Sequence, residues 1–243
     1  MILFVLSGMG KYSAYSAGGT SAAVFDELPK TLKALLGFGS LDVTTISGFY
    51  AMLIPYLELT TAIHAALLGS NIIAKEERDK TAEFLNTKPV SRNHIITGKL
   101  LAALFQVAIV NLVSTISSVL MVAQYNKGED ITGEILAFML SMFLVQLIFL
   151  ALGAALATML HSPKASGSVS ISILLGAYVI AKITDLTDKV NVLNVLSPFK
   201  YFDCYRIVNG DGLNPAISLL SLFLVVILVA LTYIFYRKRD MHV

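Results

Sequence analysis

Long apolar segments separated by short polar ones run through most of the chain. Residues 100–126, 135–163 and 212–236 contain no Asp, Glu, Lys or Arg. Each is longer than the roughly 20 residues that a helix needs to cross the hydrocarbon of a bilayer. Residues 43–74 are interrupted only by Glu58, and residues 165–181 form a shorter run that ends at Lys182. The pattern predicts transmembrane helices, the shorter one extended by a lysine that reaches the interface.

The N-terminal residues predict one more span, which begins at Met1. Residues 1–10 are apolar, and residues 12–17 can complete the helix beyond Lys11. No basic residue precedes the apolar run, which disfavours a cleavable signal peptide. We therefore expect an all-α membrane protein, a six-helix transmembrane bundle in a single domain over residues 1–243. The approximate spans are 1–17, 47–74, 100–124, 135–160, 166–183 and 214–236.

Composition supports a membrane protein and narrows its chemistry. Hydrophobic residues make up 56% of the 243 positions and charged residues 14%, whereas soluble domains carry about 25% charged residues. A net charge of +2 without a basic and aromatic cluster excludes nucleic acid as the expected partner. Cys204 is the only cysteine, so an internal disulfide and a cysteine metal site are both excluded, and we expect a buried or inert thiol.

A dense polar segment, residues 75–99, separates the second and third expected spans. It contains ten of the 34 charged residues of the chain. Together with residues 161–167 and 237–243 it carries ten basic residues in 39 positions, against eight in the 78 positions of the segments on the opposite side. Because the more basic side of a membrane protein faces the cytosol, we expect residues 75–99 and both termini to be cytosolic.

Local signals give this segment a shape. Glu76 and Lys80 form a favourable i,i+4 pair, and Pro89 disfavours helix at the residue before it. Ser91 can cap a new helix that continues through Ile95 into the third span. The sequence thus predicts a short cytosolic helix, a turn and a re-entry helix. Mixed charge on such a helix suits a protein partner better than a lipid headgroup.

Polar residues inside the expected spans are candidates for function, because they are costly in a membrane. Glu58, Thr61, His64 and Asn71 share one broad face of the second span, with two interpretations: a translocation path or a set of interhelical hydrogen bonds. In the third span, the stripe Asn111, Ser114, Thr115 and Ser118 favours packing.

Small residues recur every four positions in two later spans. They are Gly153 and Ala157 in the fourth span, and Ser168, Ser172 and Gly176 in the fifth. Such spacing allows close approach of helix backbones. Packing within one protomer and packing between protomers both remain open.

Signatures of enzymes are absent from the sequence. There is no HExxH and no GxSxG motif, and the four histidines are scattered. Gly10-Lys11 resembles only the tail of a phosphate loop, since Val5 and Tyr12 stand where that motif needs Gly and Ser or Thr. We expect no catalytic residue, no metal site and no bound cofactor, so a partner must supply any energy that the protein uses.

The run from Glu76 to Ala102, EERDKTAEFLNTKPVSRNHIITGKLLA, resembles the cytosolic loop of type-2 ABC transporter permeases. That family's pattern has acidic residues, a Thr-x-Glu, Pro-Val-Ser-Arg and a Gly-Lys. These positions are here Glu76, Glu77, Thr81, Glu83, Pro89, Val90, Ser91, Arg92, Gly98 and Lys99. Residues 197–203 and the basic residues 236–240 also resemble the family. Such permeases usually open with a basic amphipathic helix, whereas this sequence begins at the expected first span.

The resemblance implies a permease subunit, not an enzyme, of an ABC exporter in the cell membrane. It implies a cytosolic ATP-binding subunit that binds ATP, and a second permease copy or a sister permease. The implied docking residues are Glu76, Glu77, Arg78, Thr81, Glu83, Pro89 and Arg92, on a coupling helix. The cargo is then an amphipathic or hydrophobic substrate. The alternative is a non-transporting membrane anchor that recruits or regulates a cytosolic partner.

Overall fold

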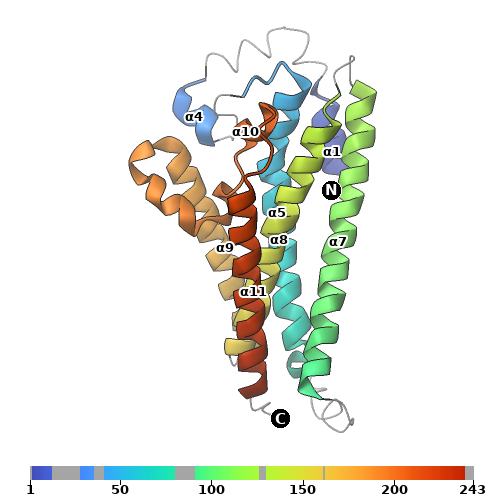
Figure 1. The fold of residues 1–243 in the computed structure, drawn as a ribbon, viewed down its shortest axis with the longest axis vertical. Helices are drawn as coiled ribbons and strands as arrows, with labels where there is room; N and C mark the ends of the chain where they lie inside the picture. The colour runs from blue at the N-terminus through green and yellow to red at the C-terminus, as the bar shows by residue number, and fades with distance from the viewer. Residues whose placement is uncertain are drawn as a thin grey trace. The chain divides into compact units, whose positions relative to one another are not determined.

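The computed structural model describes residues 2–12, 28–35, 41–79, 91–125, 130–160 and 162–238, and these ranges contain helices and no strand. This confirms the all-α prediction for the described part of the chain. The elements, in chain order (Figure 1), are α1 (Ile2–Met9), α4 (Lys30–Leu35), α5 (Ile46–Arg78), α7 (Arg92–Tyr125), α8 (Thr132–Met159), α9 (Pro163–Leu186), the 3₁₀ helices η1 (Asp188–Leu196) and η2 (Pro198–Lys200), α10 (Cys204–Val208) and α11 (Pro215–Lys238).

Five of these helices, α5, α7, α8, α9 and α11, are long and apolar enough to cross a membrane. The protein is therefore a multi-pass membrane protein. The first expected span is not among them. Helix α1 has eight residues, fewer than a crossing requires, and residues 13–27 lie outside the described ranges. The six-span arrangement thus stays a prediction.

Helix α5 begins at a tight turn that leaves no room for a side chain. The Gly48 backbone N–H donates to Thr45 Oγ1 at 3.1 Å, which is a helix N-cap. A Cβ on Gly48 would lie 2.0 Å from the Asp42 carbonyl oxygen. The carboxylate of Asp42 accepts hydrogen bonds from the Thr44 hydroxyl and backbone N–H, and these bonds lower the pKa of Asp42. The close approach of the Gly48 and Asp42 backbones and the N-cap at Thr45 together specify this turn.

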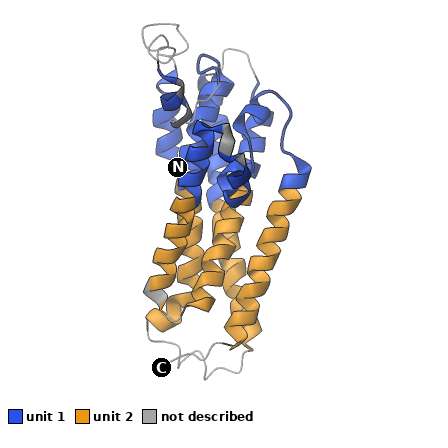
Figure 2. Ribbon diagram, turned by 90° about the vertical axis from the view of Figure 1, so that its left-hand side faces the viewer, with its two compact units in different colours: residues 1–59, 110–142, 177–217 blue, residues 60–109, 143–176, 218–243 orange. Residues whose placement is uncertain are grey.

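The described chain divides into two compact units (Figure 2). Unit 1 comprises Met1–Leu59, Val110–Met142 and Ala177–Ile217, and unit 2 comprises Thr60–Ile109, Phe143–Gly176 and Ser218–Val243. In unit 1, α1 packs through Val5 and Met9 on the first part of α5. Asn111 of α7 donates to the Met139 carbonyl of α8 at 3.0 Å. That bond supports the packing interpretation of the polar stripe in α7.

Unit 2 contains a close crossing of α5 and α8. A Cβ on Gly69 would lie 2.1 Å from the Leu150 carbonyl oxygen, and one on Gly153 would lie 2.2 Å from the Ala66 carbonyl oxygen. The small residues of α8 therefore pack within the protomer. On α9 the stripe Ser168, Ser172 and Gly176 is exposed, and both interpretations of it remain open.

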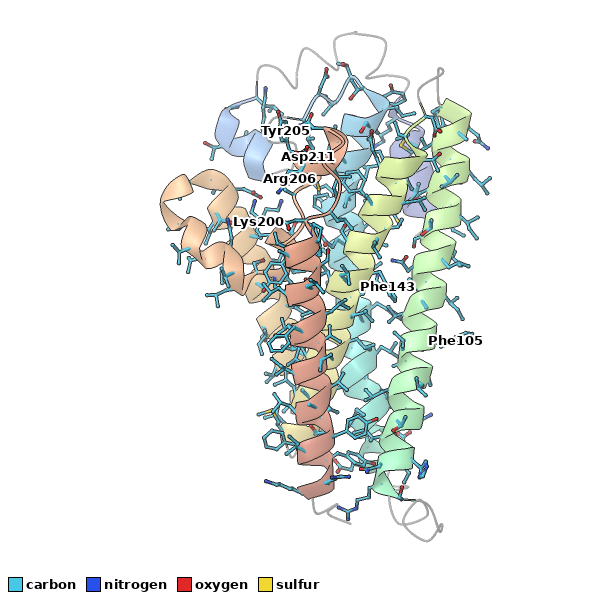
Figure 3. The ribbon with its side chains drawn as sticks, in the orientation of Figure 1. Phe105, Phe143, Lys200, Tyr205, Arg206 and Asp211 are labelled. Atoms are coloured by element: carbon cyan, nitrogen blue, oxygen red, sulfur yellow. The ribbon has the colours of Figure 1, made fainter. Side chains whose placement is uncertain are left out.

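The outer faces of unit 2 are apolar. Phe105 of α7 is 69% exposed, and Phe223 and Val226 of α11 are similarly exposed. Figure 3 shows Phe105 pointing away from α7 to the outside, whereas Phe143 of α8 packs against the apolar cluster around Ala65 and Ala103. Exposed side chains of this kind on candidate spans are suited to lipid acyl chains.

Candidate functional site

The predicted docking segment begins inside a long helix rather than on a separate one. Helix α5 continues without a break through Glu76 and Glu77 to Arg78. Arg78 is exposed and donates to Asn71 Oδ1 at 2.9 Å and to Asp79 Oδ1 at 3.2 Å. Thr81, Glu83 and Pro89 lie outside the described residues, so the short coupling helix stays a prediction.

An ion pair ties the two borders of this segment together. The Lys99 ammonium of α7 pairs with the Glu76 carboxylate of α5, and Lys99 Nζ also donates to the Ile73 carbonyl at 3.2 Å. The Lys99 and Glu76 side chains are only 11% and 22% exposed. The i,i+4 rule pointed Glu76 at Lys80. The structure pairs Glu76 with Lys99 on the next long helix. Lys80 lies outside the described residues, so the i,i+4 pair stays a prediction.

The start of α7 is capped as predicted. The His94 backbone N–H donates to Ser91 Oγ at 3.3 Å, and the Ile95 N–H donates to the Ser91 carbonyl at 3.2 Å. From there α7 runs uninterrupted into the apolar segment. Ser91 is the N-cap of this helix, as its hydroxyl and position indicated.

Helix α11 joins the same end of unit 2. Arg237 Nε donates to Asn93 Oδ1 at 2.9 Å, and Arg92 Nη1 donates to the Arg237 carbonyl at 3.2 Å. One turn along α7, the hydroxyls of Thr97 and Tyr233 share a hydrogen bond of 2.6 Å. Three helices, α5, α7 and α11, are therefore linked by polar contacts near the two ends of the predicted docking segment, residues 75–99. We call this set of contacts, Glu76–Lys99, Asn93–Arg237, Arg92–Arg237 and Thr97–Tyr233, the base of the docking segment.

Sequence reasoning missed most of this base. Lys99 entered only as part of a family pattern, and Arg237 only as part of a basic C-terminal end. Thr97 and Tyr233 gave no signal, because their pairing depends on how α7 and α11 align across 136 residues. Arg92 was predicted as a docking residue, and the structure places its guanidinium on the backbone of α11.

The four residues of the predicted translocation path divide between the units. Glu58 belongs to unit 1, where it is 8% exposed. Thr61 of unit 2 is buried, His64 is half-buried, and Asn71 is exposed and bonded to Arg78. The translocation path stays a prediction.

Metal chemistry has no basis among the described residues. No three His, Cys, Asp or Glu side chains in these ranges are grouped so that they could hold a metal ion. The contacts at the base of the docking segment are an ion pair and hydrogen bonds between helices. They link α5 and α7 near the two ends of residues 75–99.

Comparison with known proteins identifies the family of the chain. A family model described as ABC-2 family transporter protein matches residues 1–241. A search of curated proteins returned no match. The family match covers nearly the whole chain, including residues 75–99 and α11. The chain therefore belongs to the ABC-2 family of transporter permeases, and it is a membrane component of a transporter.

Proposed function

We propose that the chain is the permease subunit of an ATP-driven exporter in the cell membrane. ATP is bound and hydrolysed by a separate cytosolic subunit, which docks on residues 75–99. A second copy of the chain or a sister permease completes the transporter. Both termini face the cytosol, and the cargo is amphipathic or hydrophobic.

The pairing of Glu76 with Lys99 is the observation that carries this proposal. A loop that only links two spans can move without moving either of them. Here the two ends of the loop are bonded to each other through a largely buried ion pair. A displacement of the docking segment is therefore passed to α5 and α7 together, as coupling requires.

We assign the predicted docking residues to different roles. Glu76 faces Lys99, so it belongs to the base that transmits movement and not to the docking surface. Glu77, Thr81 and Glu83 are the side chains that we assign to the ATP-binding subunit, with Arg78 beside them. Pro89 ends the docking helix, and Arg92 anchors the return by its bond to α11.

The translocation path is proposed along Glu58, Thr61, His64 and Asn71. Glu58 and Thr61 are buried in the conformation that the structure describes. They line a path only after helices around them separate. A transport cycle driven by the docking segment supplies such a separation.

Co-purification with the ATP-binding subunit tests the docking segment. The expected result is that Glu77→Lys and Glu83→Lys abolish the complex, or the stimulation of ATP hydrolysis by the permease, while the protein still inserts. Asp211→Lys is the matched control, because Asp211 is an exposed acidic residue far along the chain from the segment. Unchanged stimulation in both segment variants would refute the proposed dock.

A transport assay distinguishes the permease hypothesis from the membrane-anchor hypothesis. Reconstituted with the ATP-binding subunit, a permease moves an amphipathic fluorescent substrate across the vesicle membrane only when ATP is hydrolysed. An anchor binds the partner and leaves the substrate where it was. Binding without any ATP-dependent movement across a panel of such substrates would favour the anchor.

A further inference from the structure

Two basic residues end α11 beside the first turn of α7. Arg237 and Lys238 are both exposed. Arg237 Nε donates to Asn93 Oδ1 at 2.9 Å, and Arg92 Nη1 donates to the Arg237 carbonyl at 3.2 Å. Figure 1 shows both helix ends at the same end of unit 2. We call this place, where three cationic side chains come together, the α7–α11 junction.

Acidic residues do not balance this junction within the described ranges. Glu76 is already paired with Lys99. Asp79 is already paired with Arg78. No carboxylate of the described chain pairs with the basic residues of α11, and the bond of Arg237 to Asn93 joins a cation to a neutral amide. Neighbouring like charges repel, and an anion bound between them offsets the repulsion. The junction therefore favours an anionic ligand.

The side chain of Arg237 is suited to a phosphate. An arginine carries five N–H donors, of which the bond to Asn93 uses one. Parallel N–H donors of a guanidinium bind the oxygens of a phosphate in pairs, and Lys238 adds a compact positive charge. Since Asn93 already holds the Arg237 side chain, less conformational freedom is lost when a ligand binds.

The junction lies at the level of phospholipid headgroups. Residues 212–236 contain no Asp, Glu, Lys or Arg and end directly before Arg237. The hydroxyls of Thr97 and Tyr233 share a hydrogen bond of 2.6 Å, and tyrosine is enriched at the border between hydrocarbon and water. Arg237 follows Tyr233 by four residues, which is about 6 Å along the helix. The headgroup layer on each side of a bilayer is about 5–7 Å thick.

Exposed apolar side chains lead to the junction on both helices. On α11, Ile234 is exposed and lies one turn before Lys238. On α7, Leu101 and Phe105 are exposed one turn apart, and Figure 3 shows Phe105 pointing to the outside. A phospholipid carries both a phosphate and acyl chains. It therefore matches a cationic junction above apolar side chains better than a protein of the cytosol does.

We infer that the α7–α11 junction binds the phosphate of an anionic phospholipid through Arg92, Arg237 and Lys238, with the acyl chains along Ile234 and Leu101. The lipid then bridges α7 and α11 at the base of the docking segment. This inference depends on the membrane crossing of these two helices and not on an ATP-binding partner. It can fail while the proposed function stands.

Native mass spectrometry of the purified permease in detergent, without an ATP-binding subunit, tests the junction. Phosphatidylglycerol and phosphatidylcholine with identical acyl chains are added at equal concentrations, and soluble glycerol phosphate serves as a competitor. Arg237→Gln and Lys238→Gln remove one cation each. Arg206→Gln is the matched control, because Arg206 is an exposed arginine of unit 1 that pairs with Asp211. Lys238→Arg retains the charge.

The expected result is that the permease binds phosphatidylglycerol several-fold more than phosphatidylcholine. Each neutral variant at the junction is expected to reduce this preference at least threefold, whereas Arg206→Gln and Lys238→Arg retain it. Lys238 is exposed and forms no ion pair within the described ranges, so Lys238→Gln is expected to fold even where Arg237→Gln does not.

Three outcomes would overturn the inference. One is equal binding of the two lipids, or a preference that neither neutral variant changes. Another is displacement of phosphatidylglycerol by glycerol phosphate at equal concentration, which would identify a free phosphate as the ligand. The third is loss of the complex with the ATP-binding subunit in Lys238→Gln without any lipid preference in the unmodified protein, which would assign the junction to a protein partner.

Discussion

Replacing Lys99 by Met removes the cation that joins α5 to α7. The change leaves the Glu76 carboxylate without its partner and takes a donor from the Ile73 carbonyl. Loss of one partner of a fully buried pair costs about 3–5 kcal/mol, and exposed pairs contribute about 0.2–1 kcal/mol. The side chains of this pair are 11% and 22% exposed, so we expect a loss of about 2 kcal/mol. For a chain of this size that lowers the Tm by about 4–8 °C.

The assay is thermal unfolding of the purified permease in detergent, without an ATP-binding subunit. Glu76→Gln is expected to lower the Tm by a similar amount. The double variant is expected to lose less than the sum, with a coupling energy of about 1 kcal/mol or more. Asp79→Asn is the control, because the Arg78–Asp79 pair is exposed, and its effect should stay within about 0.5 kcal/mol. Additive effects of the two changes, or a Glu76→Gln variant that matches the control, would refute the role of Glu76 in the base.

Three further outcomes are expected from the described contacts. Gly153→Ala should destabilise the protein by about 1–3 kcal/mol in thermal unfolding, because its Cβ meets the Ala66 carbonyl oxygen; Gly98→Ala, which meets nothing within 4 Å, should be neutral or stabilising. Burial raises the pKa of the Cys204 thiol to about 12, so maleimide labelling at pH 8 should be roughly a thousandfold slower than for an exposed thiol and should speed up as pH rises; fast labelling of the folded protein contradicts this. Ser91→Ala should cost about 1 kcal/mol and speed amide exchange in the first turn of α7, whereas Ser91→Asn should retain the cap.

The sequence predicted those features that depend on residues close together in the chain. Long apolar runs, one of them interrupted only by Glu58, predicted where five long helices lie, and a single hydroxyl before Arg92 predicted the start of α7. The i,i+4 rule could not indicate Lys99 as a partner of Glu76, because the rule holds within one helix and Lys99 lies on another. Its pairing depends on how α5 and α7 align, which a single sequence does not encode locally.

The small-residue pattern shows the same limit of prediction from a single sequence. Spacing predicted that Gly153 permits close approach, and it could not choose between a partner inside the chain and one outside. The close contact between Gly69 and the Leu150 backbone identifies α5 as the helix that packs on α8. The contacts of α11 with α7 left no trace in the sequence, since neither Thr97 nor Tyr233 differs from an ordinary residue of a membrane helix.

The crossing at Gly69 and Gly153 also limits how α5 and α8 can move past one another. On each helix a carbonyl oxygen occupies the gap left by the missing side chain of the other. Sliding either helix along its axis drives a neighbouring side chain into that oxygen. Rotation about the contact point keeps the two gaps filled and meets no such obstacle. The crossing is therefore a fulcrum, at which these two helices can tilt but not shear.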